Sequence, residues 1–306
     1  MRLLSCFAPY PIPVDILDSE GLKRHNAFPQ DFSIDRLELI IEALQTLSLL
    51  DIIEVSDGGH ETQPAITVHN LVLEANRNHL AIADRTTQAK ITRTAVELLE
   101  IATALPPEDR ANHHWWSLLY PHIMQITCST EAPSREIAEP LLQVGLRNFS
   151  YMHLAFRHPV GEAATALRAI SESLDPNHAL RLAARHRYAF ARLSGTAAAM
   201  EFRGLYKQEK EILGEFHPET LMSHHNWAER LADSGNFKEA ERELRKVLQG
   251  RREILGKSHP YTLSTHRVLI DTVLAQKNGR DRAESEWEEV YESINSAKNP
   301  GLVDLE

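Results

Sequence analysis

The sequence predicts a mainly α-helical protein in which a small N-terminal module with a β-hairpin precedes an α-solenoid. Three observations lead to this fold class. A segment near the C-terminus recurs after 42 residues, apolar residues follow helical spacing through most of the chain, and two alternating segments flank a turn near residue 58. We expect a module over residues 1–84, a helical bridge over 85–135, and a solenoid over 136–306. The solenoid should hold about four helical pairs, of which the last two are clear.

Composition narrows the classes of protein that this chain can belong to. Its 306 residues carry a formal net charge of −10, whereas a general nucleic-acid binder needs a basic face. The two cysteines, Cys6 and Cys128, are too few for a disulfide framework or a four-cysteine zinc site. No apolar run approaches the roughly 18 residues of a membrane span, and the N-terminus lacks a small-residue cleavage site. We therefore expect a cytoplasmic protein that does not contact membranes.

The first module should contain short helical segments around residues 3–7 and 14–17, and a clear helix over 34–50. Ser33 is the expected N-cap of that helix, and one face carries an apolar stripe. The stripe consists of Leu37, Ile40, Ile41, Leu44 and Leu47. Strands are expected over 50–55 and 65–69 around a turn, with another helix over 71–83. Helices, a hairpin and a further helix in this order describe a winged-helix-like module.

Two motifs in this module resemble the winged helix of NB-ARC (STAND) ATPases. Phe7-Ala8 with Ile12-Pro13 resembles the motif that opens it, and residues 68–72 (Val-His-Asn-Leu-Val) resemble its Met-His-Asp-Leu-Val signature except at the first and third positions. The resemblance implies that His69 senses the β-phosphate of bound ADP where an ATPase domain lies upstream. The sequence given holds no Gly-x-x-x-x-Gly-Lys-Ser/Thr phosphate loop. It therefore resembles the C-terminal part of such a protein, in which His69 is structural or idle.

A winged helix can also bind DNA, but the charge of this module is unfavourable. Residues 1–84 hold five basic and thirteen acidic residues, a net charge of −8. The candidate recognition helix carries Asp35, Glu38 and Glu42 beside Arg36, so it would repel phosphate. Nucleic-acid binding is therefore the minor interpretation of this module.

The bridge should form a helix over 86–105, ended by Pro106-Pro107, and a second helix that contains His113, His114, Trp115 and Trp116. Neighbouring residues on a helix point about 100° apart, so the two histidines cannot chelate one ion together. We expect no metal site here, and expect one of the tryptophans to anchor the bridge against the first repeat.

The duplicated segment organises the solenoid. Glu-Ile-Leu-Gly, His-Pro and Thr-Leu occur at 211–214, 217–218 and 220–221, and again at 253–256, 259–260 and 262–263. Each copy should form two helices around a turn, at Gly235-Asn236 in the first copy and at Gly279 in the second. The small residues Ala228 and Ala240 allow the two helices of the first copy to approach closely. Further back the pattern weakens, and His178-Ala179-Leu180 is placed where Thr-Leu stands in the later copies.

This pattern resembles tetratricopeptide repeats of the long kinesin-light-chain-like type. The resemblance favours a protein- or peptide-binding scaffold, the sensor or adaptor half of a STAND-like signalling protein, with its ligand on the concave solenoid face. The alternative is a winged-helix transcriptional regulator with a tetratricopeptide sensor domain. We expect no enzyme, because no Gly-x-Ser-x-Gly, His-Glu-x-x-His or dinucleotide-type glycine cluster occurs. No catalytic residue, cofactor or metal is predicted, and homo-oligomers are possible.

The predicted partner-binding residues are four side chains on the first helices of the last two repeats. His225 aligns with Arg267 and Glu229 with Asp271, since each pair is 42 residues apart. Within each helix the two residues are four apart and share one face. A polar strip of this kind suits an extended peptide of mixed charge, and an ordinary solvated face is the alternative.

Overall fold

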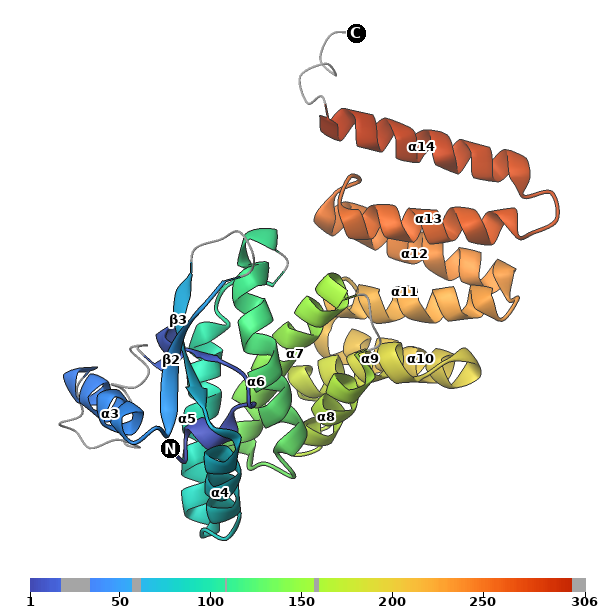
Figure 1. The fold of residues 1–306 in the computed structure, drawn as a ribbon. Coiled ribbons are helices and arrows are strands. Elements are labelled where there is room, and N and C mark those ends of the chain that lie inside the picture. Colours follow the sequence, from blue (N-terminus) through green and yellow to red (C-terminus); the bar gives the residue numbers. More distant parts are fainter. Residues whose placement is uncertain (18–33, 57–61, 108, 157–159, 299–306) are drawn as a thin grey trace. The chain divides into compact units, whose positions relative to one another are not determined.

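The computed structural model describes residues 1–17, 34–56, 62–107, 109–156 and 160–298 (Figure 1). The chain divides into two compact units, Met1–Ala184 and Arg185–Glu306. Both predicted boundaries, near residues 84 and 135, fall inside the first unit, so the division into three parts stays a prediction. The proposed cap Ser33 and most of the turn after Val55 lie outside the described residues.

The first unit contains a three-stranded antiparallel sheet in the order β1-β3-β2. The strands are β1 (Ile12–Pro13), β2 (Leu50–Val55) and β3 (Gln63–Val68). Ile66 of β3 lies opposite both Ile12 and Ile52. Ala65 and Ile66 have no solvent-exposed surface, because β3 is the central strand and the helices of the unit cover it. The expected hairpin is therefore present, with a short third strand that the sequence pattern did not indicate.

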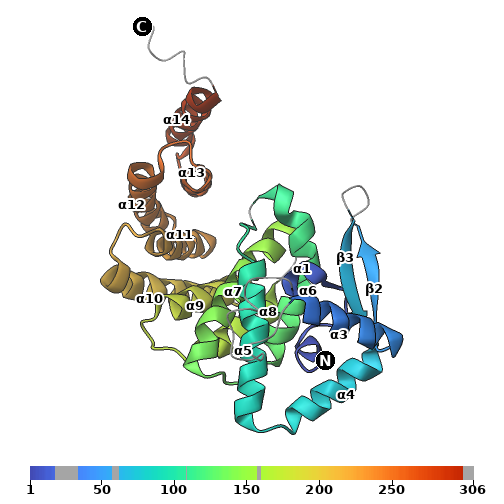
Figure 2. The ribbon, with the colours of Figure 1, turned by 90° about the vertical axis from the view of Figure 1, so that its left-hand side faces the viewer.

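The predicted long helix is shorter than expected and is not buried along its stripe. It forms α3 (Ile34–Thr46), and Ser48, with φ 53°, turns the chain before β2 begins at Leu50. Ile41 is buried, but Ile40 and Leu47 are 45% and 66% exposed. Among the described residues α3 packs mainly on β2 (Figure 2), which covers Ile41 and leaves Ile40 and Leu47 exposed.

The other elements of the first unit are helices that follow the predicted order. They are η1 (Leu4–Cys6), α1 (Val14–Leu17), α4 (Asn70–Ala81), α5 (Arg85–Ala102), η2 (Arg110–Asn112), α6 (His113–Ser129), α7 (Arg135–Phe156) and α8 (Gly161–Ser171). The carboxylate of Asp84 caps α5 by accepting the N–H of Thr87 at 3.0 Å. Helix α6 continues through Pro121, which lies inside the helix.

His122 of α6 connects the N-terminal segment to the helices of the first unit. Its Nδ1 accepts the N–H of Ala8 at 3.2 Å, so the ring proton lies on Nε2, which is 3.1 Å from the carbonyl oxygen of Pro11. The ring also meets Phe7 edge-on at 5.6 Å. His122 is fully buried, and burial lowers its pKa to about 4. Both ring nitrogens contact backbone groups, so this histidine is structural.

The two neighbouring tryptophans fix α6 against the end of α5 and against α7. The indole N–H of Trp115 donates to Ala102 O at 2.7 Å, and that of Trp116 donates to Leu105 O at 3.2 Å. Trp116 is fully buried and stacks on Tyr151 of α7 at 5.8 Å. Because α7 is the helix predicted to begin the first repeat, Trp116 lies where an anchor between bridge and repeat was expected.

The second unit is a series of antiparallel helical pairs. It contains α9 (Ala179–Arg192), whose first turns precede the unit boundary, α10 (Gly195–Leu213), α11 (Pro218–Asp233), α12 (Phe237–Leu255), α13 (Pro260–Leu274) and α14 (Arg280–Lys298). Figure 1 shows α11 to α14 stacked in chain order. Gly214 and Gly256 end two of the second helices with φ of 95° and 88°, a conformation that glycine adopts without strain.

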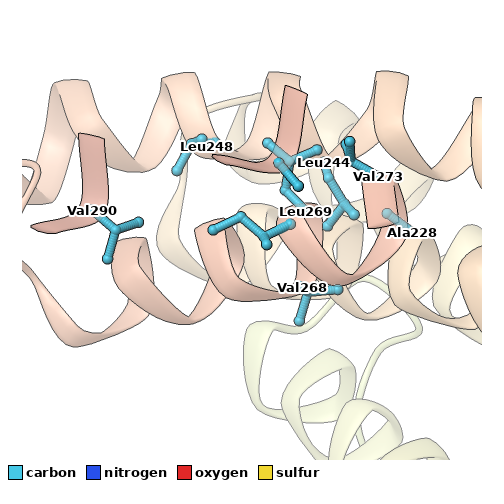
Figure 3. Packing of buried hydrophobic residues seen from close by; sticks show 9 residues of the cluster. Ala228, Leu244, Leu248, Val268, Leu269, Val273 and Val290 are labelled. Carbon is cyan, nitrogen blue, oxygen red and sulfur yellow. The ribbon is translucent and has the colours of Figure 1, made fainter. Parts of the chain in front are cut away.

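The core of the last two pairs is apolar and closely packed. Leu244 and Leu248 of α12 meet Leu269 and Val273 of α13, and α14 contributes Val290 (Figure 3). Ala228 and Ala283 are fully or almost fully buried within this cluster, where their small side chains allow the helix backbones to approach. The helical pairs predicted from the 42-residue spacing are therefore present in the structure.

Candidate partner-binding face

Each first helix of the second unit begins at a histidine that acts as its N-cap. Nδ1 of His217 accepts the N–H of Glu219 at 3.3 Å, and Nδ1 of His259 accepts the N–H of Tyr261 at 3.2 Å. His178 makes the same contact with Leu180 at 3.3 Å. These imidazoles satisfy backbone donors that a helix start leaves without partners.

The cap of α9 corrects the predicted alignment of the first of these pairs. His178 occupies the place of His217, and not that of the Thr-Leu motif, so this spacing is 39 residues where the next is 42. With the corrected alignment Tyr188 and Ala189 correspond to Trp227 and Ala228. Ala189 and Ala228 are both fully buried, as equivalent contact positions should be.

A polar contact between the two helices of a pair recurs in all three described pairs of the second unit. His224 Nε2 is 3.0 Å from Glu243 Oε2, and His266 Nε2 is 2.7 Å from Glu286 Oε2. In the first pair Arg185 and Glu201 take these places, at 2.9 Å. The sequence contains this signal, since His224 and His266 are 42 residues apart, but the inserted residue before Glu286 obscures it. These contacts fix the first helices, which carry the predicted binding residues.

The four predicted binding residues lie in two different environments. Arg267 and Asp271 form an exposed ion pair at 3.1 Å on α13. Glu229 of α11 is partly exposed and pairs with Arg230 at 2.8 Å. His225 differs from the expectation of a solvated strip, because only 8% of its surface is exposed. The strip that reaches solvent therefore consists of Glu229, Arg267 and Asp271.

His225 lies inside the unit because the helices on both sides of α11 cover it. Burial lowers its pKa to about 3, and the guanidinium groups of Arg251, Arg267 and Arg230 lower it further. Its Nδ1 has no hydrogen-bond partner among the described residues. The His225 ring is therefore neutral at pH 7 and packs beneath the exposed face. It cannot offer a positive charge to a ligand.

Beneath the same face, the junctions between pairs carry opposite charges. Arg251 of α12 donates to the carbonyl oxygen of Tyr261 at 2.8 Å and to the Thr265 hydroxyl at 2.6 Å. Glu209 of α10 occupies the equivalent position one pair earlier, with Ser223 where Thr265 stands. Neither carboxylate oxygen of the fully buried Glu209 has a hydrogen-bond partner among the described residues. Burial raises the pKa of Glu209 to about 7.

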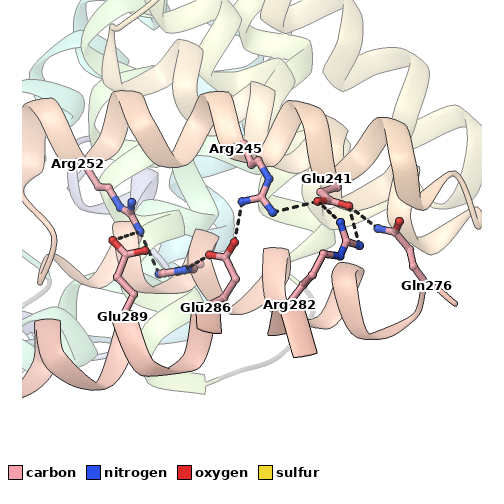
Figure 4. A network of polar contacts seen from close by, with 8 residues as sticks. Glu241, Arg245, Arg252, Gln276, Arg282, Glu286 and Glu289 are labelled. Atoms are coloured by element: carbon pink, nitrogen blue, oxygen red, sulfur yellow. Dashed lines mark hydrogen bonds and ion pairs between the residues drawn. The ribbon is translucent and has the colours of Figure 1, made fainter. Parts of the chain in front are cut away.

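The second helices α12 and α14 are joined by a polar network (Figure 4). Arg245 bridges Glu241 and Glu286 at 3.0 and 2.7 Å, and Arg282 donates to Glu241 at 3.0 Å. Arg252 lies 2.9 Å from Glu289. The charges of this surface are thus largely compensated within the network.

One group in this network has the geometry of a metal site. Single ligand atoms of His266, Glu286 and Glu289 lie within 4.8 Å of one another. The guanidinium groups of Arg245 and Arg252 already occupy these carboxylates, and a cation there would meet two positive charges. The His266–Glu286 contact also repeats the Arg185–Glu201 contact, in which arginine cannot bind a metal. These three residues are therefore better explained as a structural contact between helices than as metal ligands.

A substitution at His266 tests this assignment. His266→Arg should leave the melting temperature within about 2 °C, because arginine makes the same contact at position 185. His266→Leu should lower the melting temperature by about 4 °C, equivalent to roughly 1 kcal/mol for a unit of this size. Thermal unfolding followed by circular dichroism measures both. A rise in melting temperature on adding Zn²⁺ to the wild-type chain, absent in His266→Arg, would contradict the structural assignment.

Comparisons with known proteins agree with the repeat pattern. Residues 220–261 match a family model described as a tetratricopeptide repeat. None of the curated proteins matches the chain. Among the helices that the structure describes, none combines the length and apolar character needed to cross a membrane.

Two solved structures with similar chains come from Podosopora anserina, and both are described as nearly identical TPR-like repeats of a candidate kinesin light chain. One is 22% identical, with a TM-score of 0.38, and the match covers 72% of this chain and 95% of that one. The other, a variant with a single substitution, is 23% identical, with a TM-score of 0.40 and coverage of 74% and 96%. At this similarity neither structure indicates what the chain binds. The family match indicates a tetratricopeptide repeat over residues 220–261, and the capped helical pairs around it agree with further repeats in this part of the chain.

Proposed function

We propose that the chain is a scaffold that binds a protein or an extended peptide on the first helices of its repeats. The observation that supports this most is the arrangement of exposed polar groups over a fixed buried layer. Glu229 and Asp271 lie at matching positions of α11 and α13, and Arg267 forms an exposed ion pair with Asp271. Beneath them His225 and Arg251 are buried, and Arg251 is hydrogen-bonded to α13. A face held in place in this way loses little conformational entropy when a ligand binds.

The exposed ion pair of α13 offers a test of this face. Peptides selected from a random library for binding to the wild-type chain serve as probes. Arg267→Glu combined with Asp271→Arg keeps the pair but reverses its direction. We expect affinity for peptides of mixed charge to fall at least tenfold, which is about 1.4 kcal/mol. The melting temperature should change little, because both side chains are more than half exposed.

A matched reversal separates this effect from a general change in charge. Lys210 and Glu215 form another exposed ion pair, at 2.7 Å, and Lys210→Glu with Glu215→Lys should leave peptide affinity unchanged. If the Arg267/Asp271 reversal has no effect on any selected peptide, the ligand does not bind this face and the proposal is wrong.

We propose in addition that the scaffold is the sensor or adaptor half of a STAND-like cytoplasmic signalling protein and has no catalytic activity of its own. The support is the motif resemblance around His69 and the order α3, β2, β3, α4. His69 caps α4 by accepting the N–H of Leu71 at 3.3 Å. A sensing role would therefore require release of this cap, and hydrogen exchange at the start of α4 with and without ADP in a chain that includes an ATPase domain tests it. Unchanged exchange would oppose the sensor assignment.

A further inference from the structure

The last described helix, α14, presents two large aromatic side chains to solvent. Trp287 is 49% and Tyr291 is 69% exposed. They are four residues apart and therefore lie on one face of the helix. Among the four tryptophans, Trp116 is fully buried and Trp227 is 9% exposed. Together the two rings form a contiguous apolar patch, and contiguous patches mark interaction sites more often than single exposed residues do.

The repeat shows what covers this position elsewhere. Ala283 corresponds to Ala240, so Trp287 and Tyr291 correspond to Leu244 and Leu248 of α12. Leu244 is fully buried and Leu248 is 4% exposed, because α13 packs over them (Figure 3). The position on α10, Phe202, is likewise buried. In both earlier pairs this face thus belongs to a helix–helix interface, and on α14 nothing among the described residues covers it.

The charged residues beside the aromatic pair indicate the chemistry of a helix that would fit this face. Glu284 and Glu288 correspond to Glu241 and Arg245 of α12. In the network of Figure 4, Glu241 accepts from Gln276 at 2.7 Å and from Arg282 at 3.0 Å, and Arg245 donates to Glu286 at 2.7 Å. Glu241 and Arg245 thus form a row of both charges on α12, and this row contacts residues of both charges on the next pair. The corresponding row of α14 carries two exposed carboxylates, of which Glu284 has Arg280 at 3.6 Å in a solvent-exposed ion pair. Such a pair contributes little, so the row keeps an acidic character and its complement is cationic.

We propose that this end face, made of Trp287, Tyr291, Glu284 and Glu288, binds a basic amphipathic helix of a partner protein. The apolar side of that helix covers the aromatic pair as α13 covers Leu244 and Leu248, and its lysines or arginines meet the two glutamates. A second copy of the chain is disfavoured as the occupant, since pairing α14 with itself would bring the acidic rows together. The end face shares no residue with the face of Glu229, Arg267 and Asp271, and the inference does not depend on that binding.

The test uses the whole chain and two helix-stapled peptides with the same leucine-rich apolar side. One peptide carries lysines on its polar side and the other carries glutamates. The lysine peptide should bind with a dissociation constant in the micromolar range, shift tryptophan emission to the blue and reduce its quenching by acrylamide. Trp287→Ala with Tyr291→Ala should weaken binding at least tenfold, as should Glu284→Lys with Glu288→Lys. The charge-reversed chain should prefer the glutamate peptide.

Matched variants exclude general effects of charge and of exposed aromatic groups. Glu253→Lys changes an exposed charge on α12, and Phe190→Ala removes an exposed ring from α9; both should bind the lysine peptide as the wild type does. The proposal is wrong if the two peptides bind equally, if neither binds, or if the double substitutions leave affinity unchanged. Concentration-dependent dimerisation that buries Trp287 in the absence of peptide would also overturn it, in favour of a second copy.

Discussion

Replacing Glu209 with glutamine should stabilise the second unit by roughly 2 kcal/mol at pH 8. Its folded pKa of about 7 lies above the ordinary value of 4.5, so the folded state binds more protons than the unfolded state between these pH values. The wild-type chain therefore loses stability as pH rises from 4.5 through 7, by roughly 3 kcal/mol in total. Glutamine removes this loss, although its buried amide recovers only part of the gain.

Urea unfolding at pH 5 and pH 8 measures the stabilisation by Glu209→Gln and the loss of stability of the wild type with rising pH. The difference in unfolding free energy between Glu209→Gln and the wild type should be small at pH 5 and large at pH 8. Glu211→Gln, on the same helix but exposed, is the control and should show no such pH dependence. A variant that is less stable than the wild type at pH 8 would mean that the carboxylate has a stabilising partner, and the burial argument would fail.

Replacing His122 with leucine should destabilise the first unit by roughly 2–4 kcal/mol. The volume is nearly kept, but the N–H of Ala8 and the carbonyl of Pro11 lose their partners, and an unpaired buried polar group costs about 1–3 kcal/mol. The folded pKa of about 4 is below the ordinary value of 6.5. His122 therefore contributes stability above pH 6.5 that is lost as pH falls through 4, and the variant should lack this part of the acid sensitivity.

Unfolding across pH 4 to 7 checks this, monitored by the fluorescence of Trp115 and Trp116 in a chain whose other two tryptophans are replaced by phenylalanine. His79→Leu on the exposed face of α4 is the control. Equal acid sensitivity in His122→Leu and the wild type would assign the effect to other groups. His186 and His225, whose pKa values burial lowers to about 3, act in the second unit in the same direction. Their effect should appear in a separate transition if the two units unfold independently.

The helices of the last two pairs follow from the sequence because their turns and contact residues are local signals. Gly235-Asn236 and Ala228 lie where repeat geometry needs a turn and a small side chain, and the structure confirms both. Which residues of the predicted binding face reach solvent was harder to predict. Spacing shows that His225 and Glu229 are neighbours, but a solenoid helix is covered on several sides, so spacing alone does not tell which neighbour is buried.

Contacts between pairs were the least predictable part of the candidate site. The pKa of Glu209 depends on its burial, on Glu219 of the next pair and on the arginines of the preceding helix, and none of these residues is adjacent to it in sequence. The alignment of His178 failed for a related reason. The first pair is three residues shorter, and Ala179 replaces the proline that marks the later caps.

The opposite charges of Glu209 and Arg251 also affect how the chain avoids misassembly. Helices α10 and α12 end in the same Glu-Ile-Leu-Gly sequence, and α11 and α13 begin with the same His-Pro cap. A folding chain could therefore skip one pair and dock α10 on α13, or exchange a pair with another molecule, which are known failures of repeat proteins. In a skipped arrangement Arg251 would no longer meet the Tyr261 carbonyl and the Thr265 hydroxyl, to which it donates two hydrogen bonds in the native order. Glu209, which as a carboxylate donates none, would take its place, so the second junction makes the native order of the repeats distinguishable from its closest competitor.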